Sequence, residues 1–123
     1  MDFKDTQAIY LQIADWVCDY IIGGKWTEGE RIPSVRELGM QLEVNPNTVM
    51  RAYEALQARE VIRNKRGIGF FVSENAVEQI QHERRKEFIH QVLPDVFRRM
   101  KLLGISLEEL AVAYEKYNES NNS

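Results

Sequence analysis

The sequence predicts a mainly α-helical chain with a small β-hairpin, arranged as an N-terminal winged helix-turn-helix and a C-terminal two-helix dimerisation tail. Apolar residues recur at three- and four-residue steps over much of the chain, which is the period of an amphipathic helix. Two short helical segments lie only a few residues apart, as in a helix-turn-helix. Residues 61–72 are then rich in β-branched and aromatic side chains around two glycines, a pattern typical of a hairpin.

The first helix is expected from about Ile9 to the pair Gly23-Gly24, because glycine favours a helix end. Its apolar residues follow a helical period and indicate a face that packs in the core. This face comprises Ile9, Tyr10, Ile13, Trp16, Val17, Tyr20 and Ile21.

Two capping signals define the next two helices. The Ser34 hydroxyl can accept the backbone N–H of Glu37 while the Glu37 carboxylate reaches back, so a helix is expected from Ser34 to about Leu42. Asn45 is a good N-cap and Pro46 suits the first helical position, so a second helix begins there after a short turn. Its apolar face comprises Val49, Ala52, Tyr53 and Leu56.

A hairpin is expected over residues 61–72. Gly67 and Gly69 permit the positive φ that its tip needs. Ile62 and Phe71, or their neighbours, are expected to pack back onto the helices, which completes a winged helix.

The remaining residues, 73–123, are expected to form a long helix interrupted near Pro94 and, after Gly104, a second helix opened by a capping box of Ser106 and Glu109. We therefore divide the chain into a winged helix-turn-helix over residues 1–73, a helical dimerisation region over 74–118 and a disordered tail over 119–123.

Length and composition exclude several classes of protein. A chain of 123 residues holds one ordinary domain, or a small domain with a helical appendage, and has no room for a large enzyme core. Its 44% apolar and 28% charged residues are typical of a soluble globular protein. A single cysteine, Cys18, and an N-terminus unlike a signal peptide predict a cytoplasmic protein with no membrane partner. His82 and His90 lack companions at metal-binding spacing, so we expect neither an enzyme nor a cofactor.

The net charge of −3 is unevenly distributed along the chain. Residues 25–72 carry eight basic and six acidic side chains, whereas acids are in excess on either side. Arg63, Lys65 and Arg66 lie in a stretch without any acid, so contact with phosphate is most plausible there.

The start of the second short helix has the residue types that read DNA in the major groove. Asparagine amides pair with adenine edges, and a threonine methyl contacts thymine. Asn45, Asn47, Thr48 and Arg51 supply these groups and a phosphate donor, although Asn45 is also a cap. Asn47 and Thr48 lower helix propensity without an evident structural role, which favours base contact over capping alone. Arg36 is expected to grip the backbone or a base edge, the alternative being a solvated arginine.

These residues resemble the DNA-binding domain of the GntR family of bacterial regulators, over residues 8–72. The motifs that carry the resemblance are Pro33-Ser34-x-Arg36-Glu37-Leu38, Val44-Asn45-Pro46-Asn47-Thr48-Val49, the packing positions Ala52 and Leu56, and the wing Gly67-x-Gly69-x-Phe71-Val72. Glu60 departs from the family pattern, since glycine is common at that position. The Asn-Pro-Asn-Thr sequence and a short C-terminal part are similar to the YtrA subfamily, in which a two-helix tail dimerises.

The resemblance implies operator contacts at the arginine of the first short helix, at the start of the second and at the wing. The expected DNA-binding residues are Ser34, Arg36, Asn45, Pro46, Asn47, Thr48, Arg51, Lys65, Arg66, Gly67 and Gly69. We accordingly expect a sequence-specific regulator, acting as a repressor, whose recognition helix enters the major groove and whose basic wing, 63–69, contacts the minor groove or the backbone.

The tail has two apolar stripes, larger than two helices facing only each other would cover. A second copy of the chain is the simplest partner, and a two-fold dimer predicts an inverted-repeat site with half-sites roughly 34 Å apart. The alternative is docking of the tail onto Trp16 or Tyr20 of the first helix. The stripes comprise Phe88, Ile89, Val92, Leu93, Val96, Phe97 and Met100, and Leu107, Leu110, Ala111 and Tyr114.

Two other classes of function stay open. A winged helix that binds protein instead of DNA would have few basic residues at the wing, and Lys65 and Arg66 count against it. A small-molecule effector, bound between the tail and the DNA-binding domain, is the other possibility, and the sequence does not identify it.

Overall fold

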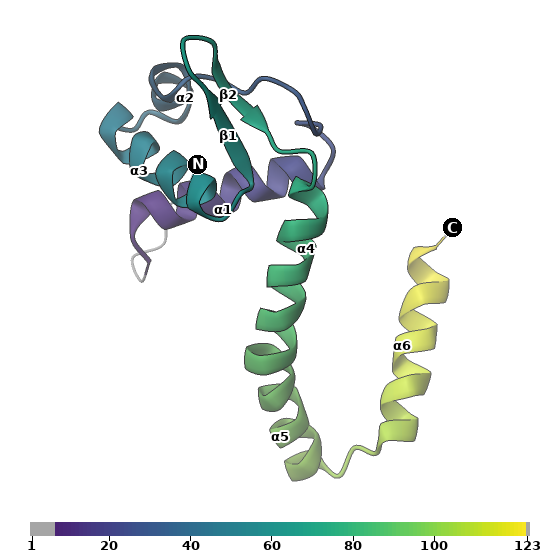
Figure 1. The fold of residues 1–123 in the computed structure, drawn as a ribbon. Helices are drawn as coiled ribbons and strands as arrows, with labels where there is room; N and C mark the ends of the chain where they lie inside the picture. The colour runs from purple at the N-terminus through teal and green to yellow at the C-terminus, as the bar shows by residue number, and fades with distance from the viewer. Residues whose placement is uncertain (1–6, 123) are drawn as a thin grey trace. The chain divides into compact units, whose positions relative to one another are not determined.

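The computed structural model describes residues 7–122 and confirms the predicted fold class (Figure 1). The chain divides into two compact units, Met1–Glu83 and Arg84–Ser123, called here the first and second units. The elements in chain order are α1 (Ile9–Ile22), α2 (Val35–Leu42), α3 (Pro46–Ala58), β1 (Ile62–Lys65), β2 (Gly69–Val72), α4 (Ala76–Glu87), the π-helical turn η1 (Phe88–Val92), α5 (Leu93–Leu103) and α6 (Leu107–Asn121).

The core of the first unit joins α1, α2, α3 and the hairpin. Ile13 and Val17 of α1 are completely buried, as are Leu38 of α2 and Leu56 of α3. Each such side chain contributes roughly 1.5–3 kcal/mol of hydrophobic stabilisation. The predicted apolar faces of the three helices therefore meet in one core, which fixes the helix-turn-helix in place.

Both predicted caps are present. The Ser34 hydroxyl accepts the Glu37 N–H at 3.1 Å, and the Glu37 carboxylate accepts the Ser34 N–H at 3.0 Å. The backbone N–H and the hydroxyl of Ser34 lower the pKa of Glu37. Asn45 accepts the Asn47 N–H at 2.8 Å, with Pro46 opening α3. These local bonds hold the N-termini of α2 and α3.

The turn between α2 and α3 depends on a close approach at Gly39. The Val44 N–H donates to the Gly39 carbonyl at 2.9 Å. A Cβ atom at Gly39 would lie only 2.9 Å from the Val44 carbonyl oxygen, so any side chain there forces the turn open.

The predicted hairpin is present, with Ile62 opposite Val72 and Lys65 opposite Gly69. Gly67 and Gly69 have φ values of 79° and 140°, so both glycines serve the expected purpose. The loop before α2 adds a pairing that the sequence did not predict, because the Ile32 N–H donates to the Phe70 carbonyl at 2.9 Å.

The backbone at Glu60 explains why glycine is common at this position in the family that the sequence resembles. It follows α3 with a φ of 62°, in the left-handed region that glycine occupies without steric cost. In this chain a glutamate occupies the position, so the fold includes the steric strain of a side chain at positive φ.

The boundary between the units lies between Glu83 and Arg84, later than the expected division after residue 73. The start of α4 belongs to the first unit because Ala76 and Ile80 are completely buried in its core. An ion pair of 2.8 Å between Arg59 and Glu83 adds a further tie from α3.

The second unit has the expected end at Gly104 and the expected capping box, but near Pro94 a π-helical turn joins α4 directly to α5 where an interruption was expected. The π-helical turn precedes Pro94, which lies in the first turn of α5, so the chain accommodates the proline without a break. Gly104 ends α5 with a φ of 69°, and the Ser106 hydroxyl accepts the Glu109 N–H at 3.1 Å.

The expected disordered tail over residues 119–123 needs correction. Helix α6 continues to Asn121, whose side-chain amide donates to the Tyr117 carbonyl at 2.8 Å and so stabilises the last turn. Ser123 lies outside the described residues. Among residues 7–122, no helix combines the length and the apolar character needed to cross a membrane.

Candidate nucleic-acid interface

Helix α3 separates a buried face from an exposed polar start. Val49 and Tyr53 are completely buried, whereas Asn45, Pro46 and Asn47 are exposed. Two more of the expected contact residues lie on this part of α3, Arg51 exposed and Thr48 half-buried. The core therefore holds the helix by one side and leaves its polar N-terminus open to a ligand.

Tyr53 links the elements around this surface. Its hydroxyl donates to the Pro33 carbonyl at 2.7 Å, just before the cap of α2, and its ring meets Phe70 of β2 edge-on at 4.9 Å. Burial, and then the Glu37 carboxylate, raise the pKa of Tyr53 well above its ordinary value, so the hydroxyl remains a donor. One side chain thus positions α3 relative to both α2 and the wing. The sequence indicated Tyr53 only as a member of an apolar face.

Arg51 is held by an aromatic ring from another helix. Its guanidinium carbon lies 4.1 Å from the centroid of the Tyr10 ring on α1. A cation over a ring face is attracted by the ring quadrupole, while its N–H groups point outward in the guanidinium plane. This arrangement restricts the direction of Arg51 and leaves donors for a phosphate.

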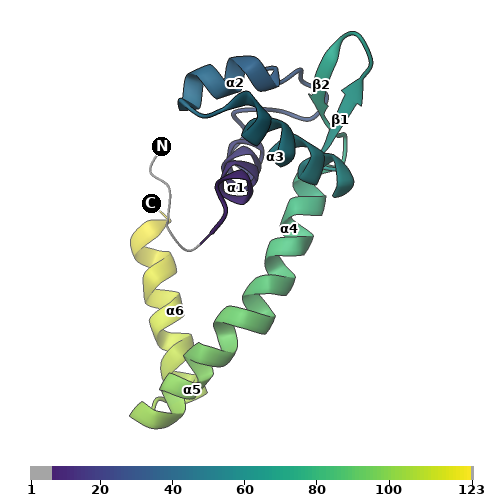
Figure 2. The ribbon, with the colours of Figure 1, turned by 90° about the vertical axis from the view of Figure 1, so that its left-hand side faces the viewer.

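The start of α2 adds a second candidate contact surface. Arg36 is exposed in the first turn, and Ser34 is half-buried beside it. The Ser34 hydroxyl oxygen already accepts the cap bond, so the role that the geometry demonstrates for this serine is structural. In both views α2 and the tip of the hairpin lie on the same side of α1 (Figure 1 and Figure 2).

The wing presents exposed basic groups around its glycines. Lys65, Arg66 and Gly67 are exposed and Gly69 is half-buried. The Lys65 ammonium lies 4.3 Å from the centroid of the Phe71 ring, which keeps the lysine along the hairpin.

Arg31 joins the wing although sequence reasoning missed it. A Cβ atom at Gly69 would lie 2.9 Å from Nε of Arg31, so the arginine side chain lies directly against this glycine. Arg31 is brought there by its bridge to Phe71 across the outer edge of β2. No periodicity or cap marks such a pairing, because its partners are far apart in the sequence.

The predicted site residues therefore fall into two groups on the first unit, the paired starts of α2 and α3 and the wing. Their contacts to DNA stay predictions. Within residues 7–122, no three histidine, cysteine or acidic side chains are grouped so that they could hold a metal ion.

Comparison with known proteins adds independent findings. Residues 9–72 match the family described as "Bacterial regulatory proteins, gntR family". The chain is 33% identical over 117 residues to the uncharacterized HTH-type transcriptional regulator YhcF of Bacillus subtilis, covering 95% of each protein. It is also 33% identical over 110 residues to the HTH-type transcriptional repressor YtrA of the same organism, covering 89% of this chain and 84% of YtrA.

Two solved structures extend the comparison. A putative transcriptional regulator of the GntR family from Bacteroides thetaiotaomicron is 48% identical, with a TM-score of 0.81 over 92% of this chain and 98% of that one. The DNA-binding domain of AraR in complex with operator ORR3 is 25% identical, with a TM-score of 0.54 over 59% of this chain and 88% of that one. The earlier resemblance is thereby confirmed, and the chain belongs to the GntR family, as a DNA-binding transcription regulator of the YtrA type.

Proposed function

We propose that this chain is a repressor that binds an inverted-repeat operator as a homodimer, with α3 in the major groove and the wing on the minor groove or the backbone. The observation that best supports this proposal is the two-sided character of α3. Its buried face anchors the helix, while Asn45, Asn47 and Thr48 lie at its free N-terminus.

The groups on α3 and α2 divide by chemistry. Asn47 has the amide for an adenine edge, and Thr48 has a methyl group for thymine. Arg51, directed by Tyr10, and Arg36 are suited to phosphate, since guanidinium binds its oxygens in a planar fork. Sequence preference is thus assigned to Asn47 and Thr48, and general affinity to the arginines.

The wing supplies a second, less selective contact. Lys65, Arg66 and Arg31 place positive charge around Gly67 and Gly69. At Gly67 nothing lies within 4 Å of where a Cβ atom would be, so the backbone there can approach DNA without an intervening side chain. A bound YtrA-type dimer would therefore hold each half-site by a helix and a wing.

The proposed homodimer rests on the second unit. None of the residues of η1, α5 and α6 is buried, although many are apolar. Leu102, Leu103 and Leu107 are each more than 70% exposed. A hollow of about 410 Å³ between α5 and α6 has a mainly apolar lining that includes Met100 and Leu110. A second copy of the chain would cover these surfaces and place two α3 helices on one operator.

The test is selection of bound duplexes from a random DNA library at physiological salt, with stoichiometry measured on the enriched sequence. We expect an inverted repeat that holds two chains. Enrichment of a single half-site holding one chain would contradict the homodimer, and no enrichment by folded protein would contradict sequence-specific binding.

Two variants then test the assignment of roles. Arg66→Ala should weaken binding to all sequences alike and lower the salt dependence of affinity by about one counterion. Asn47→Ala should weaken only the enriched sequence, by about 1–3 kcal/mol. Equal losses on the enriched and random duplexes for both variants would refute the division between base and phosphate contacts.

A further inference from the structure

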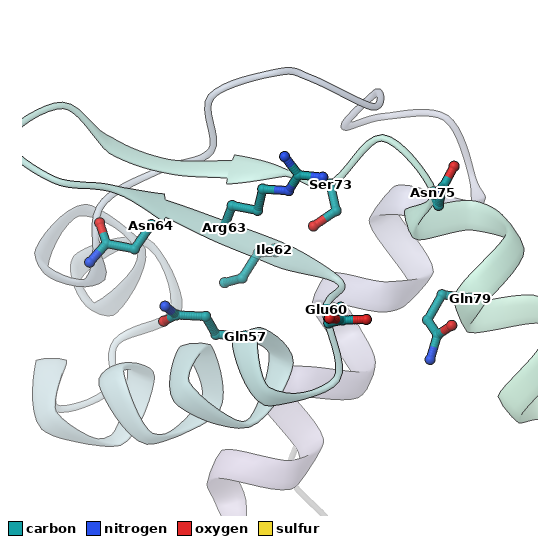
Figure 3. Close-up of a pocket in the computed structure, with 8 residues that line it drawn as sticks. All are labelled: Gln57, Glu60, Ile62, Arg63, Asn64, Ser73, Asn75 and Gln79. Carbon is teal, nitrogen blue, oxygen red and sulfur yellow. The ribbon is translucent and has the colours of Figure 1, made fainter.

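The first unit has a polar cavity that the proposed DNA contacts do not use. It measures about 560 Å³ and lies between the end of α3, strand β1 and the start of α4 (Figure 3). This volume falls within the roughly 300–1,000 Å³ typical of small-molecule sites. Seven of its eight lining side chains are polar, and they are Gln57, Glu60, Arg63, Asn64, Ser73, Asn75 and Gln79.

Within this lining, Ser73 has a buried hydroxyl without a hydrogen-bond partner among the described residues. Its side chain is 5% exposed, and its hydroxyl makes no hydrogen bond to any residue that the structure describes. Its backbone is satisfied, because the Ser73 N–H donates to Val61 and the Ser73 carbonyl accepts from Ala76. A buried hydroxyl without a partner destabilises a fold. Because the Ser73 oxygen is itself sealed from the surface, a group in the cavity would bond to it only after the serine side chain turned toward that group.

The charges of the lining restrict the chemical class of ligand that the cavity could bind. Glu60 supplies one carboxylate and Arg63 one guanidinium, both from exposed residues, so the open cavity is lined by one charge of each sign. A phosphodiester would meet the repulsion of Glu60. None of the eight lining residues is aromatic, so a nucleobase or a sugar ring would find no surface on which to stack.

The backbone of Glu60 supports a role for its carboxylate. This residue is held at a φ of 62°, where glycine would be free of strain. The Glu60 side chain, which is present despite this strain, lines the cavity.

We propose that this cavity binds a free α-amino acid. The ligand carboxylate would accept hydrogen bonds from Arg63 and, once the Ser73 side chain turned toward the cavity, from the Ser73 hydroxyl. The ligand ammonium group would donate to Glu60. The four carboxamides of the lining both donate and accept, so they suit a polar ligand side chain. The site lies within the first unit, whereas the effector site left open from the sequence would lie between the tail and the DNA-binding domain.

The consequence for regulation rests on the proposed function. Because α3 and β1 line the cavity and also belong to the proposed DNA interface, an occupied cavity should change operator affinity. Ligand binding can be measured without DNA, so a failure of the ligand proposal is distinguishable from a failure of the proposed function.

The direct test is titration of the full chain, without DNA, with each standard L-amino acid, followed by backbone amide NMR. We expect at least one to bind and to shift the amides of residues 60–64 and 73–79. The N-acetyl and the carboxamide derivatives of that amino acid should each bind at least about tenfold more weakly, since each lacks one charge. No binding by any standard amino acid, or equal binding of the derivatives, would overturn the proposal.

Three variants localise the site. Ser73→Ala should weaken binding about tenfold while leaving the melting temperature unchanged or higher, because it removes an unpaired buried hydroxyl. Glu60→Gln should weaken binding to a similar degree, whereas Glu74→Gln, an exposed glutamate outside the lining, should not. Unaltered affinity in Ser73→Ala or Glu60→Gln would place the ligand elsewhere. Operator affinity that does not respond to the bound amino acid would remove the regulatory consequence and leave the site.

Discussion

The two units of this chain differ in where their apolar side chains lie. In the described part of the chain, every fully buried apolar residue falls between Ile13 and Ile80. Beyond Ile80 the chain is still largely helical, yet Phe97, Leu102 and Leu103 are at least half exposed. Helical periodicity alone therefore does not indicate a core, because the same pattern serves intrachain packing in one unit and an open surface in the other.

The difference also separates two kinds of stability. The first unit gains its stability from its own packing, which holds the proposed DNA-contact groups whether or not a second chain is present. The second unit exposes the surfaces from which a dimer would gain, so its stability should depend on protein concentration. Substitutions in the two units should accordingly be detected by different measurements.

The largest effect is expected from a charge placed on the open surface. Leu103→Glu would set a carboxylate in the proposed dimer contact and should convert the dimer to monomer, as measured by light scattering. Operator affinity should then fall by about 10²–10⁴-fold, because the two half-sites are no longer bound together. Ser120→Glu adds the same charge at an exposed polar position of α6 and should leave both properties unaltered. A dimeric Leu103→Glu protein would refute the assignment of this surface.

Truncation of a core side chain in the first unit should instead lower the free energy of unfolding. Leu56→Ala removes a completely buried side chain and should lower the free energy of unfolding by about 2–5 kcal/mol. Urea denaturation should show this loss at every protein concentration. Met40→Ala, at a side chain that is 77% exposed in the same unit, should change stability by less than about 0.5 kcal/mol. Similar losses for the two variants would contradict a core confined to the buried set.

The features that the sequence predicted well are those set by near neighbours. Ser34 with Glu37 and Asn45 with Pro46 signal their helix starts within three residues, so both caps could be found without a structure. The wing glycines were found in the same way. By contrast, Arg31 reaches Gly69 only through pairing across the sheet edge, which no local pattern encodes.

The later domain boundary and the polar cavity have the same origin. Ala76 and Ile80 looked like the start of a separate tail, but they complete the core of the first unit. Ser73 carries no signal in the sequence, because its unpaired hydroxyl becomes visible only once α3, β1 and α4 surround it. The sequence thus anticipated most of the fold and the exposed polar start of α3, while groups assembled from distant segments required the structure.

Tyr53 should give the first unit a stability that depends on high pH. Its folded pKa is raised by burial, so above about pH 10 the unfolded chain releases a proton that the folded chain retains. The free energy of unfolding should therefore decrease as the pH rises past about 10, by up to about 1.4 kcal/mol per pH unit from this group.

Tyr53→Phe isolates that contribution. The variant should lose about 1–3 kcal/mol at neutral pH, because the Pro33 carbonyl loses its partner, and it should have a flatter decline at alkaline pH. Tyr117→Phe, at a tyrosine that is 66% exposed, serves as the matched control. An alkaline decline of equal slope in the Tyr53→Phe and parent proteins would show that Tyr53 titrates normally.

The smallest expected effect concerns how the core of the first unit directs Arg51. Tyr10→Leu removes the ring beneath the guanidinium and should weaken operator binding by about two- to fivefold, since a cation–π contact at an exposed site contributes about 0.5–1 kcal/mol. Tyr10→Phe retains the ring and should bind like the parent protein. In an Arg51→Ala background, Tyr10→Leu should have no further effect, because the two residues act through one contact. Additive losses in the double variant would mean that Tyr10 supports α1 packing instead of the direction of Arg51, and competition binding on the enriched operator measures the difference.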